Sequence, residues 1–213
     1  MKYIVALLAA ITVVSLFPSC GSNKPAPKHV VSDTVVAETE TDTVLSDSMI
    51  CELKMAHKRS MELYKDEQYY KYVEYIYPNL FRYLKNKFHS SSVETEKSKY
   101  VDLLIARNDN YWEKVVPTIS PNASSYSFAF KKVEYFHKSK KNMFVIYKQQ
   151  AFYVTANDTI NSQNTNYGYA IFLDKDNKWF FLDSKTKDIE NILKGDFSKA
   201  DIEDIVEKTK HLR

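Results

Sequence analysis

An α+β fold is predicted for this chain, with helices first, an antiparallel sheet next and two short helices last. Between Ile50 and Val115, apolar residues recur every three or four positions, as they do on one face of a helix. From Tyr126 to Asp183 the pattern changes to short runs of aromatic and β-branched residues, which favour strands. The chain has only three glycines, and this scarcity excludes a phosphate-binding glycine loop.

Residues 1–19 have the layout of a secretory signal peptide. Lys2 supplies a positive charge, and Tyr3 begins an almost unbroken apolar run that ends at Phe17. This run is shorter than the roughly 20 residues that a membrane-spanning helix needs, which makes a retained transmembrane helix the weaker alternative.

The cleavage point resembles the bacterial lipobox, because Ser19 and Cys20 follow the apolar stretch. The resemblance implies lipidation of Cys20 and a membrane partner reached through the acyl chains. We therefore expect a lipid-anchored protein of the cell envelope, on the outer membrane facing the periplasm, with the cell surface as the alternative. A plain signal peptide, cut elsewhere and leaving Cys20 as a free thiol, remains open.

Residues 20–48 are expected to form a lipidated, disordered tether, because they contain no aromatic residue and are rich in Ser, Thr, Asp and Glu. Residues 49–213 are expected to form a single globular α+β domain. Cys51 is the only other cysteine, so lipidation of Cys20 would exclude an intramolecular disulfide. The net charge of +3 is mild, and no nucleic-acid partner is expected.

Three helices are predicted in the first half of the domain. The first covers residues 50–64, and the second covers residues 69–88 with a break at Pro78. The third begins near Ser91, where Glu94 would complete a capping box, and ends at Pro117 and Pro121. Its apolar face is predicted to consist of Val101, Leu104, Ile105, Trp112 and Val115.

Four strands are predicted at residues 126–137, 143–155, 167–174 and 178–183, joined by turns at 138–142, 157–166 and 175–177. Two helices then follow at residues 187–194 and 198–208. Gly195 ends the first of these helices, and Ser198 begins the second with Asp201 in its first turn.

This order of elements is similar to the nuclear transport factor 2-like (SnoaL-like) superfamily over roughly residues 50–183. Residues 64–69 and 72–78 look like the opening helices of exported members, and Lys178-Trp179-Phe180-Phe181 looks like their closing strand. The resemblance implies N-terminal helices packed in a curved, cone-like antiparallel sheet with a pocket at its wide end. It implies no single activity. The two extra C-terminal helices would cover or narrow that pocket.

No cofactor and no metal ion are expected. None of the five histidines has a partner at metal-ligand spacing. His57 lies among core residues of a helix, where packing explains it. Residues 174–177 begin like a calcium loop, but Lys178 and Trp179 occupy positions that a calcium loop gives to an oxygen ligand and a glycine, so a hairpin turn is predicted.

Two functional hypotheses remain. The first is a non-catalytic binding or scaffold domain for a small apolar ligand or an envelope protein. The second is an isomerase- or dehydratase-type enzyme with Glu134 as base and Tyr72 as hydrogen-bond donor, because strict alternation places Glu134 on an aromatic face with Phe128. A β-bulge between Phe130 and Val133 would instead turn Glu134 to solvent.

Four positions resemble an O-glycosylation acceptor motif of Gram-negative gut and oral bacteria, in which Asp precedes a hydroxyl residue and an apolar residue follows. Such a hydroxyl must be drawn into an enzyme, which is easiest in a tether or a loop. Chance occurrence in a Ser/Thr/Asp-rich linker is the alternative, and Ser48 could instead cap the first helix. The candidate acceptors are Thr34, Thr43, Ser48 and Thr159.

Overall fold

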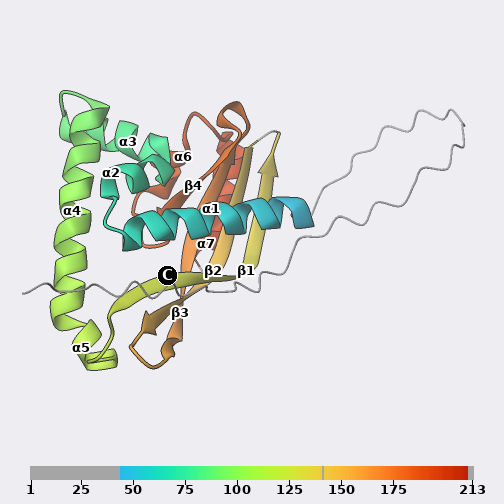
Figure 1. The fold of residues 1–213 in the computed structure, drawn as a ribbon. Coiled ribbons are helices and arrows are strands. Elements are labelled where there is room, and N and C mark those ends of the chain that lie inside the picture. The colour runs from blue at the N-terminus through green and yellow to red at the C-terminus, as the bar shows by residue number, and fades with distance from the viewer. Residues whose placement is uncertain (1–43, 141, 211–213) are drawn as a thin grey trace, which may run out of the picture. The chain divides into compact units, whose positions relative to one another are not determined.

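The structure, a computed structural model, describes residues 44–140 and 142–210 (Figure 1). The predicted signal peptide, Cys20, Thr34 and Thr43 lie outside these residues. The α+β fold class is confirmed: N-terminal helices pack against an antiparallel sheet, and two helices follow it. Within the described residues, no helix is long and apolar enough to cross a membrane.

The first helix, α1 (Asp47–Lys65), begins after Ser46, whose side chain accepts a hydrogen bond from the Met49 backbone at 3.4 Å. Ser46 is therefore the N-cap, and the alternative role of Ser48 as cap is wrong. The predicted break at Pro78 is confirmed. The segment divides into α2 (Tyr69–Tyr72), a 3-10 turn η1 (Val73–Tyr75) and α3 (Pro78–Phe88).

The long helix α4 (Val93–Lys114) is capped by Ser92, whose Oγ accepts from the Thr95 backbone at 3.0 Å. The predicted capping box of Ser91 and Glu94 is thus wrong by one residue. Val101 and Leu104 are buried as predicted, whereas Ile105 is 41% exposed. Helix α4 ends at Lys114, shortly before Pro117 as predicted, and Pro117 lies in the first turn of the short helix α5 (Val116–Ile119), where its missing N–H costs nothing.

Four strands form one antiparallel sheet in the order β1-β2-β3-β4. They are β1 (Ser125–Ser139), β2 (Asn142–Val154), β3 (Thr159–Leu173) and β4 (Lys178–Asp183). The loop predicted at 157–166 is mostly wrong: β3 already pairs with β2 from Thr159, which lies opposite Val154. Backbone hydrogen bonds extend the hairpin through this polar stretch regardless of its side chains.

Strand β1 contains two interruptions of its register with β2, between Phe130 and Lys132 and between Val133 and Tyr135. The first lies where a bulge was predicted, and the second was not expected. Each bulge adds one residue to the strand and so changes which side chains share a face. As a result Phe130, Val133 and Phe136, each three positions apart, all pack toward the same core.

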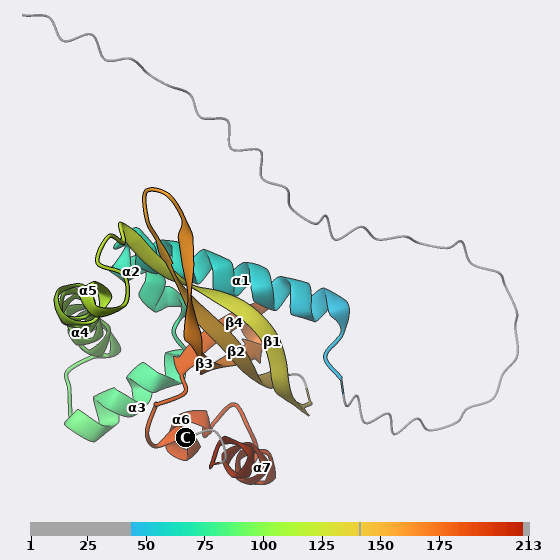
Figure 2. The ribbon, with the colours of Figure 1, turned by 90° about the horizontal axis from the view of Figure 1, so that it is seen from below.

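The sheet is covered on both faces (Figure 2). Helix α1 packs on one face, where Leu53 joins Val145, Phe172 and Trp179 of the strands. The C-terminal helices α6 (Ile189–Leu193) and α7 (Lys199–Lys210) pack on the other face, together with α3. Trp179 is only 3% exposed, which agrees with the predicted closing strand. The buried clusters of the described structure draw only on residues from Leu45 onward.

A group of hydrogen bonds, here called the α7 clasp, joins α7 to β1. His137 of β1 contacts two carboxylates of α7, with Nε2 at 2.9 Å from Asp201 and Nδ1 at 3.0 Å from Asp204. Ser139 donates to Asp201 at 2.5 Å, and Tyr135 donates to Asp204 at 2.5 Å. Asp201 also accepts from Ser198, which caps the helix. The clasp therefore fixes the start of α7 against the sheet.

The clasp predicts a pH-dependent stability. Burial disfavours the charge of Asp201, but hydrogen bonds from Ser139, Ser198 and His137 outweigh it and hold the pKa of this carboxyl well below its usual 3.8. Because the folded pKa is depressed, the carboxylate stabilises the fold fully above about pH 5, and this contribution is lost as pH falls further. We expect Asp201→Asn to lower the free energy of unfolding by about 1 to 3 kcal/mol at neutral pH.

Urea unfolding of parent and variant between neutral pH and pH 3 measures this difference. Asp102→Asn, at an exposed position on α4, is the matched control and should change little. A difference between Asp201→Asn and parent that stays constant across this range would contradict the assignment.

Candidate functional site

A cavity of about 470 Å³ lies between the α1 face of the sheet and the helices α1, α2, α4 and α5. Its described lining includes no residue of α6 or α7. The expectation that these helices cover or narrow the pocket is therefore wrong, because they pack on the opposite face of the sheet. Tyrosines dominate the lining: they are Tyr64, Tyr72, Tyr100, Tyr111, Tyr126, Tyr147, Tyr153 and Tyr167.

Helix α4 and strand β2 supply much of this lining, and in each of them the lining residues recur at regular spacing. Helix α4 contributes residues at steps of three or four, and β2 contributes every second residue from Tyr147 to Tyr153. These periods keep side chains on one face of a helix or a strand. The face of α4 consists of Tyr100, Leu104, Arg107 and Tyr111, and the face of β2 consists of Tyr147, Gln149, Ala151 and Tyr153.

At the α5 end of the cavity, the tyrosine hydroxyls bond to protein groups. Tyr126 donates to the side-chain oxygen of Asn108 at 2.8 Å, and the hydroxyls of Tyr111 and Tyr153 are 2.5 Å apart. Burial, followed by the neighbouring phenols, raises the pKa values of Tyr111 and Tyr126 well above that of a free tyrosine. At this end of the cavity, the tyrosine hydroxyls are therefore already engaged in hydrogen bonds within the protein.

The inner tyrosines Tyr72, Tyr100 and Tyr147 differ from these in the hydrogen bonding of their hydroxyls. No described residue forms a hydrogen bond with the hydroxyl of Tyr72, Tyr100 or Tyr147. These groups lie close enough to interact electrostatically with one another and with Asp183. Burial raises the pKa of Tyr100 to about 12 and those of Tyr72 and Tyr147 above the ordinary value. All three therefore stay neutral at physiological pH.

Gly168 of β3 makes room for the ring of Tyr147. A Cβ atom on Gly168 would lie 2.5 Å from Cζ of that ring, far inside van der Waals contact. The absence of a side chain on Gly168 thus lets Tyr147 lie flat over the strand and face the cavity. Phe130 stacks on this ring, with centroids 5.2 Å apart.

His57 of α1 contacts two residues that line the cavity, Tyr147 and Gln149. Its side chain is 2% exposed, and its Nε2–H donates to Oε1 of Gln149 at 3.0 Å. Burial lowers the pKa of His57 and keeps the ring neutral. Gln149 lines the cavity, and its NH₂ group forms no hydrogen bond with another described residue. The packing role predicted for His57 is seen in its edge contacts with Tyr147 and Phe181.

Arg107 and Asp183 lie at the cavity mouth, 3.7 Å apart, with side chains 58% and 41% exposed. Oδ1 of Asp183 accepts a hydrogen bond from the Lys185 backbone at 2.8 Å, within the turn that follows β4. The carboxylate is therefore engaged in the local turn. Lys185 lines the same mouth.

Of the two candidates for catalysis, Tyr72 lines the cavity and Glu134 does not. Glu134 lies at the second bulge of β1, which turns it away from the α1 face. Its Oε1 bonds to Lys148 at 2.8 Å and to Lys132 at 3.1 Å, and these lysines lower its pKa. The structure does not bring Glu134 and Tyr72 together, and a lowered pKa is the opposite of what a general base requires.

The remaining candidate residues are not brought together at any site. Ser48 is exposed in the first turn of α1, Thr159 is exposed at the start of β3, and Cys51 is half-buried. Residues 174–177 form the predicted turn, a 3-10 segment η2 (Asp174–Asp176) followed by a left-handed Asn177. In the described ranges, no cluster of His, Cys, Asp or Glu is arranged to hold a metal ion.

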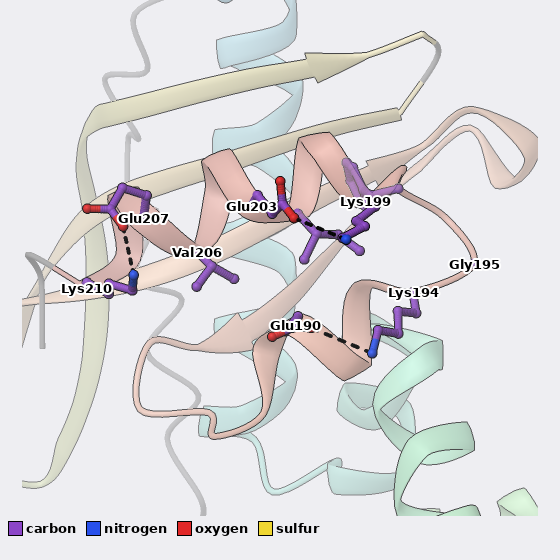
Figure 3. Close-up of a pocket in the computed structure, with 10 residues that line it drawn as sticks. Glu190, Lys194, Gly195, Lys199, Glu203, Val206, Glu207 and Lys210 are labelled. Carbon is purple, nitrogen blue, oxygen red and sulfur yellow. Dashed lines mark hydrogen bonds and ion pairs between the residues drawn. The ribbon is translucent and has the colours of Figure 1, made fainter.

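A second cavity, of about 460 Å³, lies between α6 and α7 (Figure 3). Phe197, Ile202 and Val206 contribute its apolar wall. Its rim charges are paired within their own helices, Lys194 with Glu190, Lys199 with Glu203 and Lys210 with Glu207. It therefore lacks the unengaged, inward-facing polar groups that make the first cavity a better candidate site.

The close approach of Gly168 to Tyr147 generates a test. We expect Gly168→Ala to lower the free energy of unfolding by about 1 to 3 kcal/mol, because the new methyl displaces a buried ring. In a Tyr147→Leu background the same change should cost much less, since the clashing ring is gone. Urea unfolding of the four proteins in this cycle measures the coupling, and additive costs would mean that Tyr147 does not pack on Gly168.

Comparison with models of protein families finds no match, and comparison with curated proteins finds none either. Among solved structures, the chain is similar to a protein from Catenulispora acidiphila, with 8% sequence identity and a TM-score of 0.40. The matched region covers 63% of this chain and 86% of the other chain. It is also similar to a Catenulispora acidiphila structure in complex with S-DNPA, at 8% identity and a TM-score of 0.39, covering 64% of this chain and 90% of that one.

Proposed function

We propose that this chain is a lipid-anchored protein of the cell envelope whose tyrosine-lined cavity binds a small, largely apolar ligand without transforming it. The cavity carries the proposal, since it is mainly aromatic and contains a few polar groups with unused hydrogen-bonding capacity. This composition is typical of ligand pockets. We also propose that the domain is a nuclear transport factor 2-like cone, as helices lie over one face of a curved antiparallel sheet and enclose the cavity.

Binding is favoured over catalysis by the groups that line the cavity. Among the described lining residues, Asp183 is the only carboxylate, and there is no histidine or cysteine. The tyrosines cannot act as bases, because their pKa values are raised. Proton transfer at neutral pH needs a group that titrates near neutrality. Glu134, which the enzyme hypothesis required, is outside the cavity.

The cavity predicts binding of a neutral apolar probe. The chain from residue 21 onward suits this test, because it retains every residue of the buried clusters and has no lipidated cysteine. We expect N-phenyl-1-naphthylamine to show saturable fluorescence enhancement with one probe per chain. Ala151→Trp should abolish it by filling the cavity, and Ala151→Leu should weaken it.

Ala200→Trp, at an exposed position of α7 on the opposite side of the sheet, is the control for adding a tryptophan. Circular dichroism of each variant checks the fold. Probe binding that is absent from the parent, or unaffected by either change at Ala151, would contradict the proposed function.

The anchor predicts a second outcome. Cys20→Ser should move the full-length protein from the detergent phase to the aqueous phase of a Triton X-114 separation, because the attachment site of the acyl chains is lost. Cys51→Ser, which changes the other cysteine of the chain, should leave the partition as in the parent. A Cys20→Ser protein that stays in the detergent phase would refute lipidation at this position.

A further inference from the structure

We propose that the ligand of the cavity is an organic anion, with an aromatic body that carries acceptor oxygens inside the cavity and a carboxylate or similar oxyanion held by Arg107 at its mouth. This inference rests on the proposed binding function and adds the charge and hydrogen-bonding character of the ligand. Three observations support it: the polarity of the inner groups, the geometry of the ion pair at the mouth and the placement of Arg107.

The inner polar groups are hydrogen-bond donors. Raised pKa values keep Tyr72, Tyr100 and Tyr147 protonated, so each carries an O–H that no described residue accepts. Gln149 also lines the cavity and adds an NH₂ group that no described residue accepts. These groups line the cavity and are not sealed in the core. A ligand rich in acceptor oxygens would therefore find donors there.

The ion pair at the mouth leaves Arg107 available. Its Nη2 is 3.7 Å from Asp183, beyond the range of an N–H···O hydrogen bond. Both side chains are well exposed, and such pairs contribute little to stability. The carboxylate of Asp183 is meanwhile held by the Lys185 backbone. A ligand carboxylate could thus take a bidentate hydrogen bond from the guanidinium without breaking a strong contact.

The position of Arg107 on α4 directs it to the cavity. It continues the helix face of Tyr100, Leu104 and Tyr111, all of which line the cavity. Lys185 adds a second positive charge at the mouth, against the single negative charge of Asp183. A cationic ligand in an aromatic cage would prefer the opposite arrangement, with carboxylates at the mouth and acceptors within. The charges here favour an anion.

A matched pair of probes tests the inference. 8-anilinonaphthalene-1-sulfonate and N-phenyl-1-naphthylamine share the same aromatic body, and only the first carries an anionic group. In the chain from residue 21 onward, we expect the sulfonate to bind about tenfold more tightly than the neutral amine, the gain typical of one charge-assisted contact. Arg107→Gln should remove this advantage and leave binding of the neutral amine within about twofold of the parent.

Lys114→Gln, which removes the same charge from an exposed position in the last turn of α4, is the control for the overall field of the protein. It should leave the preference for the sulfonate intact. Equal binding of the two probes, or an equal loss in Arg107→Gln and Lys114→Gln, would overturn the anion proposal while the cavity function stands. Binding of neither probe would overturn both. Tighter binding of a trimethylammonium probe with the same aromatic body than of the sulfonate would also overturn it, in favour of a cation site.

Discussion

The contact between α1 and the sheet at His57 is the constraint on which the cavity depends. His57 is wedged edge-on between the rings of Phe130, Tyr147 and Phe181, and it holds Gln149 by a hydrogen bond. A charged imidazole would be strongly disfavoured at this depth, which is why burial lowers the pKa. The neutral ring thus sets the distance between helix and sheet. It also orients two residues that face the ligand space, Tyr147 and Gln149.

The two faces of the sheet have separate roles. On one face, α6 and α7 close the core through Ile192, Leu193 and Ile205, and the α7 clasp fixes them to β1. On the other face, α1 packs over the strand ends near Phe172 and Trp179, and the cavity begins where that packing ends. Both faces therefore contain buried residues, such as Ile192 and Trp179, that do not line the cavity.

Side-chain patterns predicted the helices and strands well where side-chain burial and backbone hydrogen bonding favour the same structure. The closing strand was predicted with its observed ends because an apolar run, a turn and buried Trp179 agree there. The start of β3 was missed because residues 161–166 are all polar, and backbone pairing with β2 is what makes this segment a strand. The N-cap of α4 was predicted one residue too early because Ser91 and Ser92 are adjacent and either could cap a helix. In the structure Ser92 is the cap, since it accepts the hydrogen bond from the Thr95 backbone.

The cavity was harder to predict because it depends on contacts between distant segments. The alternation from Tyr147 to Tyr153 and the helical spacing from Tyr100 to Tyr111 are both visible in the sequence. Neither pattern says that the two faces meet. That meeting depends on the register of β2 with β3 and on the two bulges of β1, and the second bulge also moved Glu134 to the other side.

The protonation states within the cavity support the proposal of binding over that of chemistry. At pH 7, removing the proton from a phenol whose pKa is about 12, as for Tyr100, costs about 7 kcal/mol. Among the described lining residues, Asp183 is the only carboxylate, and its Oδ1 already accepts a hydrogen bond from the Lys185 backbone. A neutral O–H in a partly desolvated site is nevertheless a strong hydrogen-bond donor. Donors of this kind beside an exposed guanidinium support the proposal that the cavity holds an oxygen-rich anion without changing it.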